Sequence, residues 1–282
     1  MINSIIKAGV IGWPVGHSRS PAIHGFWLKQ YHIAGSYDLL PVEPGQLGAA
    51  LADLRQKNYA GCNITLPHKE DALRIVDTTD ALAQKAGAVN TVIIHKNGKL
   101  EGRNSDVIGF TRNLESAGKA WRKKKPALIL GAGGAARAVI VAVAEAGCTD
   151  IRIANRSSDR ALSLSKEMNA MLGKDVVTPV GWEDREDAAK GAKLIVNTTT
   201  GGMKGEAPLD FSLKHADDDA LVTDIVYMPL MTPLLLDAKK RGHPYVDGLG
   251  MLLHQAAPGF KAWFGREPEV GPELRKAIEA TL

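Results

Sequence analysis

The stretch CNITLPHKEDA, residues 62–72, contains a lysine at a position where lysine is not expected. Its first residues alternate apolar and polar side chains as a strand does, Pro67 interrupts that strand, and a helix is expected to begin near Lys69. A helix N-terminus carries partial positive charge and favours carboxylates over ammonium groups. Lys69 is therefore expected either to point into water or to face an anionic or proton-accepting group.

Side chains that could bind a small polar ligand gather in four short motifs. Each motif is expected at a strand end or in a loop, where open α/β sheets present ligand-binding groups. The residue types suit a small polyhydroxylated anion, because hydroxyls and amides bind hydroxyl groups and serine donors bind a carboxylate. The residues are Ser18 and Ser20 in GHSRSP, Thr65 and Lys69 in NITLPHK, Asn90 in AGAVNT, and Asn104 and Asp106 in GRNSD.

Short apolar runs alternate with helical patterns along the chain, which predicts an α/β protein with mainly parallel sheets. Ser20 is expected to cap the first helix, with Pro21 at its first position, and Asn97-Gly98 predicts a hairpin turn. In the first part, strands are expected at residues 8–11, 37–41, 61–66 and 91–95, and helices at 21–31, 46–57 and 80–86.

A second α/β unit is expected to begin after Pro126. Its five predicted strands leave no sixth strand to build, so the helical tail at 251–264 and 273–282 is expected to pack back on the first domain. The predicted strands cover residues 127–130, 150–154, 193–197, 220–224 and 244–246.

The composition favours a cytoplasmic protein that binds neither nucleic acid nor a membrane. Lys and Arg exceed Asp and Glu by 35 to 31, and a net charge of +4 over 282 residues is too small to indicate a nucleic-acid surface. The basic run at 122–125 is expected to be a solvated linker. Two cysteines give no disulfide framework, and neither a signal peptide nor a membrane span is apparent.

A glycine cluster predicts a dinucleotide-binding turn. The pattern Gly131-x-Gly133-x-x-Ala136 follows a predicted strand and opens a predicted helix, and Ala132, Gly134 and Ala135 complete the turn. Gly131 would permit the tight turn, Gly133 would let the backbone approach a pyrophosphate, and the helix N-terminus would donate N–H groups to it. A tight turn without a ligand is the alternative.

The next predicted strand ends in basic and hydroxyl residues rather than the acid that usually binds the ribose of NAD. Asn155, Arg156 and Ser157 follow it, and Arg160 lies one turn later. A guanidinium pairs with a 2′-phosphate that a carboxylate would repel, so NADP is the expected cofactor. The alternative is that both arginines are surface residues of a helix start.

The chain resembles shikimate dehydrogenase from end to end. Eight motifs stand in that family's order between residues 17 and 256: HSRSP, NITLPHK, AGAVNT, NSD, GAGGAAR, NRS, NTTTGGM and DGLGMLLHQA. The resemblance implies NADP-linked interconversion of 3-dehydroshikimate and shikimate in the chorismate route of aromatic amino acid biosynthesis. It also implies a substrate domain of residues 1–106 completed by 248–282, a Rossmann domain of residues 107–247, and an active-site cleft between them.

Carried over by position, Lys69 and Asp106 match the family's catalytic pair, which would explain the placement of the lysine. As hydride reaches the ring carbonyl, an ammonium would stabilise the growing negative charge on the oxygen and provide the proton. Asp106 would orient Lys69 and bind a neighbouring hydroxyl.

Further positions match residues that hold the two ligands. Alone, Ser20 could simply cap its helix, Asn90 could form a turn and Met251 could belong to the core. By resemblance Ser18, Ser20, Thr65, Asn90, Tyr227 and Gln255 would contact substrate, while Gly248 and Met251 would line the nicotinamide side.

Some features depart from the family or lie beside its motifs. Arg103 stands where an acid is common and is expected to alter local pKa values, whereas Ser105 keeps the hydroxyl of the usual threonine. His17 and His68 have no metal-ligand spacing, so no metal site is expected and His68 is expected to line or support the pocket.

Two other functions stay open on the sequence. One is a paralogue that also acts on quinate, which differs from shikimate by one hydroxyl. The other is a catalytically silent NADP-binding regulator, against which Lys69 and Asp106 are both present. The oligomeric state is expected to be monomer or homodimer.

Overall fold

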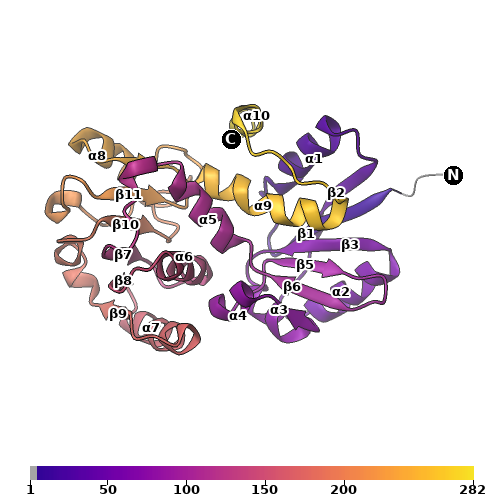
Figure 1. Ribbon diagram of the computed structural model, residues 1–282, viewed down its shortest axis with the longest axis horizontal. Coiled ribbons are helices and arrows are strands. Elements are labelled where there is room, and N and C mark those ends of the chain that lie inside the picture. Colours follow the sequence, from indigo (N-terminus) through magenta and orange to yellow (C-terminus); the bar gives the residue numbers. More distant parts are fainter. Residues whose placement is uncertain (1–4) are drawn as a thin grey trace. The chain divides into compact units, whose positions relative to one another are not determined.

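The computed structural model describes residues 5–282, which form two compact units. The first unit contains the residues up to Ser105 together with Leu253–Leu282, and the second contains Asp106–Leu252. Figure 1 shows the first unit combining early strands, drawn in indigo and purple, with the C-terminal helix α10 in yellow. Both ends of the chain therefore contribute to one unit.

The first unit is built on a mixed six-stranded sheet in the order β2-β1-β3-β5-β6-β4. Strand β1 pairs in parallel with β2 and β3, and β5 runs antiparallel to β3 and β6. The predicted hairpin at Asn97-Gly98 is confirmed, with Gly98 at a φ of 81°. The strands are β1 (Ile6–Gly12), β2 (Gly35–Pro41), β3 (Tyr59–Ile64), β4 (Thr78–Thr79), β5 (Thr91–Ile94) and β6 (Leu100–Arg103).

Helices of the first unit bury apolar faces against this sheet. On one side, Leu47, Leu51 and Leu54 of α2 pack into a core with Cys62 and Ile64 of β3. Their spacing of three and four residues places them on one helix face, as the sequence pattern requires. The helices are α1 (Ser20–Gln30), α2 (Leu47–Gln56), α3 (Lys69–Ile75), α4 (Ala81–Ala86) and α10 (Pro272–Glu279), with part of α9 (Leu249–Phe264).

The second unit is an all-parallel sheet in the order β12-β11-β10-β7-β8-β9. This is the strand order of a Rossmann fold, whose ligands bind outside the carboxyl ends of the strands where the order reverses, here between β7 and β10. The strands are β7 (Ala127–Leu130), β8 (Ile151–Ala154), β9 (Val177–Val180), β10 (Leu194–Asn197), β11 (Leu221–Asp224) and β12 (Tyr245–Val246).

Helices and short 3₁₀ turns connect these strands. All four residues of β7 and of β10 are buried, as expected for parallel strands covered on both faces. The helices are α5 (Asp106–Glu115), α6 (Gly134–Glu145), α7 (Ser158–Leu172) and α8 (Pro233–Arg241), and the 3₁₀ turns are Gly118–Ala120, Trp182–Asp184, Asp187–Ala189 and Leu213–His215.

The expectation that no sixth Rossmann strand exists was wrong. Strand β9 supplies it, pairing in parallel with β8 across Val177–Val180. This strand contains Pro179, and proline cannot donate a hydrogen bond to a central ladder. Strand β9 lies at the sheet edge, where a missing donor does no harm.

Candidate functional site

Lys69 is the first residue of α3, close behind the end of β3. The predicted strand 61–66 ends earlier, at Ile64, because the chain turns there and Pro67 has no N–H to donate. The Lys69 carbonyl accepts the Val89 N–H at 2.9 Å. Buried His68 supports the same turn, since its Nε2 lies 2.7 Å from the Val42 carbonyl oxygen.

Asn90, next to Val89, holds the segment that leads into Asp106. Its Oδ1 accepts the Ser105 N–H at 2.7 Å and the Ser105 hydroxyl at 3.1 Å. Asp106 follows Ser105, opens α5 and is buried, with 7% of its surface exposed. Lys69 and the residue before Asp106 are thus bonded to one two-residue segment, Val89–Asn90, which fixes the backbone of both candidates.

Asn63 organises the hydrogen bonds around Val89–Asn90, and its role was not predicted from the sequence. It is 5% exposed in β3, accepts the Tyr37 hydroxyl at 2.6 Å, and donates to the Asn90 carbonyl at 3.0 Å and to the Thr91 hydroxyl at 3.2 Å. Burial raises the pKa of Tyr37, while a hydrogen bond with Ser20 opposes that rise. The signal that could have revealed Asn63 was an amide within an otherwise apolar buried strand.

The candidate serines begin the first helix. Ser20 is the first residue of α1 rather than its N-cap, and the cap position is held by Arg19 without a side-chain hydrogen bond. The Ser20 hydroxyl was expected to cap α1, but the helix begins one residue earlier than predicted. The Ser20 N–H instead donates to Ser18 Oγ at 3.3 Å. Ser20 is buried, whereas Ser18 is half-buried.

Thr65 and Gln255 lie in tightly packed surroundings. A Cβ added to Gly12 of β1 would stand 2.4 Å from Thr65 Cγ2, so glycine is needed beside this threonine. Gln255 lies on α9 and is 9% exposed. Further along α9, Trp263 donates to the Val92 carbonyl at 3.0 Å and fixes the helix against β5.

The glycine turn occupies the position where the strand order reverses. Gly131 follows β7 with a φ of 111°, which a residue with a side chain rarely adopts. A Cβ there would stand 2.7 Å from Oγ1 of Thr198, the residue after β10. Thr198 in turn donates to the Leu130 carbonyl at 2.9 Å. Gly131 is thus required by a close contact between the ends of β7 and β10.

The start of α6 is open toward solvent. Gly133 is exposed, a Cβ on it would meet no atom within 4 Å, and no side chain among the described residues caps the helix. Ala132, Gly134 and Ala135 are half-buried around it. Ala136 is fully buried, in agreement with its predicted role in close helix–strand packing. These features leave the N–H groups of the first turn available to an anion.

The segment after β8 forms the start of α7. Asn155 donates to the Ser157 carbonyl at 3.0 Å, and the Ser157 hydroxyl caps α7 by accepting the Arg160 N–H at 3.4 Å. Arg156 and Arg160 are exposed, and among residues 5–282 their guanidinium groups have no hydrogen-bond or ion-pair partner. Two guanidinium groups without a partner beside a helix N-terminus suit a phosphate.

Tyr227 and Gly248 lie on neighbouring loops of the second unit. Tyr227 is half-buried in the loop after β11. A Cβ on Gly248 would stand 2.5 Å from the Ile225 carbonyl oxygen and 2.6 Å from that of Val226, so Gly248 packs directly against the start of the Tyr227 loop. Met251 is 8% exposed on α9, so it belongs largely to the core.

The charge of Arg103 is balanced locally. Its Nε lies 2.6 Å from Oε1 of Glu101, and this hydrogen bond lowers the pKa of Glu101. Nearby Asp80 accepts the Asn104 N–H at 3.3 Å, and burial raises the pKa of Asp80 although Arg103 opposes that rise.

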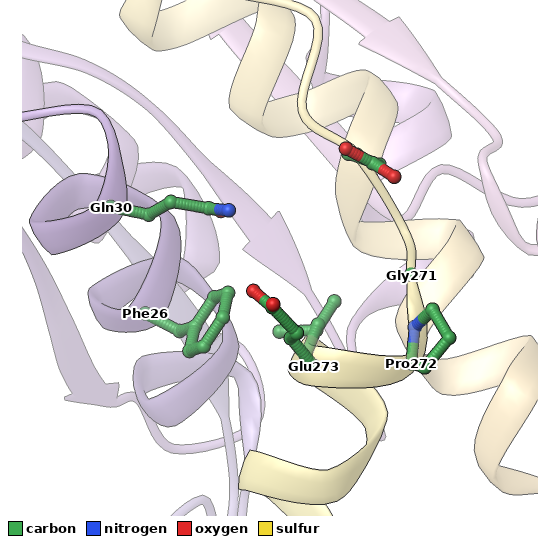
Figure 2. A pocket seen from close by; sticks show the side chains of 7 residues that line it. Phe26, Gln30, Gly271, Pro272 and Glu273 are labelled. Atoms are coloured by element: carbon green, nitrogen blue, oxygen red, sulfur yellow. The ribbon is translucent and has the colours of Figure 1, made fainter.

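The described residues also contain a pocket of about 350 Å³ in the first unit. Figure 2 shows Phe26 and Gln30 of α1 on one side and Gly271, Pro272 and Glu273 on the other. None of the predicted site residues lines it. Across residues 5–282 there is no cluster of His, Cys, Asp or Glu that could hold a metal ion, and no described helix is long and apolar enough to span a membrane.

Comparison with known proteins relates the whole chain to one family. The model of the shikimate dehydrogenase substrate-binding domain matches residues 10–92, that of shikimate/quinate 5-dehydrogenase matches residues 115–199, and that of the shikimate 5′-dehydrogenase C-terminal domain matches residues 248–272. A shikimate dehydrogenase (NADP⁺) from Paramagnetospirillum magneticum is 50% identical over 96% of this chain and 97% of its own length.

Two solved structures share the fold. Shikimate 5-dehydrogenase from Thermus thermophilus in complex with NADP(H) and shikimate has a TM-score of 0.86 and 36% identity, over 99% of this chain and 100% of its own. Quinate dehydrogenase from Corynebacterium glutamicum in complex with NAD has a TM-score of 0.91 and 32% identity, over 99% of each chain. The framework around Lys69 and Asn90, the Rossmann strand order and these matches together establish that the chain belongs to the shikimate dehydrogenase family.

Proposed function

We propose that this chain catalyses the NADPH-dependent, reversible reduction of 3-dehydroshikimate to shikimate, with Lys69 and Asp106 as its catalytic pair. The observation that carries the proposal is the bonding of Lys69 and of Ser105, the residue before Asp106, to the single segment Val89–Asn90. These hydrogen bonds fix the backbone from which both side chains extend, and catalytic groups that are positioned before the reaction begins lower its barrier.

Lys69 acts on the oxygen of the reacting carbonyl. NADP(H), when bound, supplies or accepts the hydride. The Lys69 ammonium stabilises negative charge as it develops on that oxygen and donates the proton that completes the alcohol. In the oxidative direction the same nitrogen, deprotonated, accepts the hydroxyl proton. Asp106, buried at the first turn of α5, orients Lys69 and accepts a hydrogen bond from a neighbouring substrate hydroxyl.

Hydroxyl and amide groups of the first unit bind the rest of the substrate. Ser18 and Ser20 donate to its carboxylate, and the Ser20 hydroxyl exchanges its hydrogen bond with Tyr37 for one with the substrate, because it has a single proton to donate. Because Asn90 Oδ1 already accepts from Ser105, the contribution of Asn90 to the substrate comes from its amide N–H group. Thr65 and Gln255 complete the hydroxyl and carboxylate contacts, and Tyr227 contributes from its loop in the second unit.

The second unit holds the dinucleotide. The open N-terminus of α6, at residues 131–135, binds the pyrophosphate through backbone N–H groups. Asn155, Ser157, Arg156 and Arg160 bind the adenosine end, where the exposed guanidinium groups pair with the 2′-phosphate of NADP. Gly248 and Met251 define the nicotinamide side.

Dehydrogenation of quinate is the second candidate function, because the chain shares its fold with a quinate dehydrogenase that binds NAD. Quinate carries one hydroxyl more than shikimate, and discrimination of a single hydroxyl depends on whether the pocket bonds or excludes it. The pair of exposed arginines after β8 favours the NADP-linked reaction. The finer expectations of a cytoplasmic location and of a monomer or homodimer belong to the same proposal.

Initial rates at the reduced-nicotinamide absorbance band test the proposal, with shikimate or quinate crossed against NADP or NAD. We expect turnover confined to shikimate with NADP, and a fall of about 10²–10⁴ in kcat for Lys69→Ala with shikimate binding retained in calorimetry. Lys57→Ala, an exposed lysine paired with Asp53, is the matched control and should keep the wild-type rate. Comparable turnover of quinate with NAD would favour the paralogue, and no turnover with any pair would favour a silent binder.

A further inference from the structure

Two polar side chains at the carboxyl ends of β10 and β11 form a fully buried network with a third at the start of α8. Asn197, Asp224 and Thr232 each have 0% of their surface exposed. Asp224 Oδ1 accepts Asn197 Nδ2–H at 3.0 Å and the Val226 N–H at 3.0 Å, while Asp224 Oδ2 accepts the Thr232 hydroxyl at 2.7 Å. A buried carboxylate is retained only where such donors compensate its desolvation.

On one side this network fixes the loop that carries Tyr227. Asp224 bonds both ends of that loop, through Val226 near its start and Thr232 at its end. Thr232 is also the N-cap of α8, since its hydroxyl accepts the Leu235 N–H at 3.4 Å.

On the other side the network fixes the loop after β10. Asn197 Oδ1 accepts the N–H of Thr199 at 2.9 Å and its hydroxyl at 2.7 Å, and Asn197 Nδ2 also donates to the Gly201 carbonyl at 3.1 Å. Between them stands Thr198, the residue that abuts Gly131 in the dinucleotide turn. The hydrogen bonds of the network therefore run from the loop after β10, whose Thr198 packs against the glycine turn, to the Tyr227 loop.

We propose that Asp224 is a positioning residue of the reaction, which holds the Tyr227 loop and, through Asn197, the loop that supports the glycine turn in one arrangement. The inference rests on the proposed function for the roles of Tyr227 and Gly131. Asp224 does not touch either ligand; it acts by offering acceptors to donors from both loops. Losing these acceptors frees both loops, and small misplacement of binding groups is enough to lower a rate by about 10²-fold.

Removing all of the Asp224 acceptors should impair the reaction more than removing one of them. Asp224→Ala removes every acceptor, and we expect kcat/KM for shikimate to fall about 10²-fold, with higher KM for both shikimate and NADP. Asp224→Asn keeps one oxygen for Val226 and Asn197, and the Thr232 hydroxyl can accept from the new amide. We expect kcat/KM of this variant to stay within about threefold of the wild-type value. Such recovery by asparagine is what a positioning role that depends on hydrogen bonds predicts.

The experiment combines kinetics with a readout that needs no turnover. Initial rates would be measured for Asp224→Ala, Asp224→Asn, Thr232→Val and Thr232→Ser, with thermal unfolding to show that each is folded. Hydrogen–deuterium exchange would follow residues 198–203 and 225–231. Asp217→Asn is the matched control, because Asp217 pairs with Lys193 before β11 begins and should leave both KM values within twofold.

Two results would support the proposal. In Asp224→Ala, both loops should exchange faster and the kinetic losses should appear, and the activity lost in Thr232→Val should be retained in Thr232→Ser. If Asp224→Ala fails to fold, the two Thr232 variants test the proposal instead, and we expect kcat/KM of Thr232→Val to fall about tenfold. Lower melting temperature with unchanged KM values and exchange confined to α8 would overturn the proposal, as would equal losses in Asp224→Asn and Asp224→Ala. A wild type inactive on shikimate would refute the proposed function instead, while loop exchange and NADPH binding by fluorescence would still test the network.

Discussion

His24 should make the stability of the first unit depend on pH. Its imidazole is fully buried on α1 and lies parallel to the Tyr37 ring with 3.9 Å between ring centroids. Among the described residues neither ring nitrogen has a hydrogen-bond partner. Burial lowers the pKa of His24 from 6.5 to about 3, so the folded protein keeps this ring neutral.

The direction of this pH effect follows from the number of protons that the folded and the unfolded chain bind. Between pH 6.5 and about 3 the unfolded chain holds a proton on His24 that the folded chain does not, so acid favours unfolding. The stabilisation is complete above the unfolded pKa and is lost as pH falls toward the folded one, at about 1.4 kcal/mol per pH unit. At about pH 5 the loss from this group is about 2 kcal/mol relative to neutral pH.

His24→Phe removes the titration and keeps a flat ring beside Tyr37. Urea unfolding at several values between pH 5 and 8, followed by far-UV circular dichroism and tryptophan fluorescence, would give the free energy of unfolding. We expect the phenylalanine variant to lose about 2 kcal/mol less than wild type between neutral pH and pH 5. His32→Asn, at an exposed histidine, should keep the wild-type slope. An unchanged slope in His24→Phe would refute the reasoning.

Three further changes test the framework and the cofactor site. Asn63→Ala removes three buried hydrogen bonds, so the free energy of unfolding in urea should fall by about 3 kcal/mol, and a loss below about 1 kcal/mol would contradict the role given to this amide. Gly131→Ala places a Cβ 2.7 Å from Thr198 Oγ1 at a φ of 111°, and should weaken NADPH binding in a fluorescence titration at least about tenfold; unchanged binding would mean that the turn adapts. Arg156→Ala should raise KM for NADPH about tenfold or more and leave KM for NADH unchanged, and an equal rise for both cofactors would exclude a specific contact with the 2′-phosphate.

The sequence predicted the features that depend on local chemistry. A lysine after a strand-breaking proline and a glycine cluster between a strand and a helix each carry a conformational requirement within a few residues. The structure accordingly has Lys69 at the start of α3 and Gly131 in a left-handed turn after β7. Strand β9 was missed because a proline in a strand is tolerated only at an edge, and sequence alone does not reveal which strand is the edge.

The supporting hydrogen bonds were missed because they depend on the register of strands far apart in sequence. Tyr37 of β2 and Asn63 of β3 are separated in the sheet by β1. The residue of β1 paired with Tyr37 is Ala8, and its small side chain leaves room for the tyrosine hydroxyl to reach across the strand. No spacing in the chain indicates this contact, since it arises only when three strands are aligned.

Nevertheless, the residues that make these supporting hydrogen bonds share one feature that can be seen in the sequence: each is an amide or carboxylate near the end of a strand. Asn63, Asn197 and Asp224 each lie in the last two residues of a buried strand, in YAGCNI, LIVN and LVTD. Ladder hydrogen bonds stop at a strand end, and the buried backbone groups of the following loop need other partners. An amide or carboxylate at that point supplies such partners, as Asn197 does for Thr199 and Gly201 and Asp224 does for Val226. A polar residue that closes an otherwise apolar strand is therefore itself a prediction of a residue that positions the functional loop.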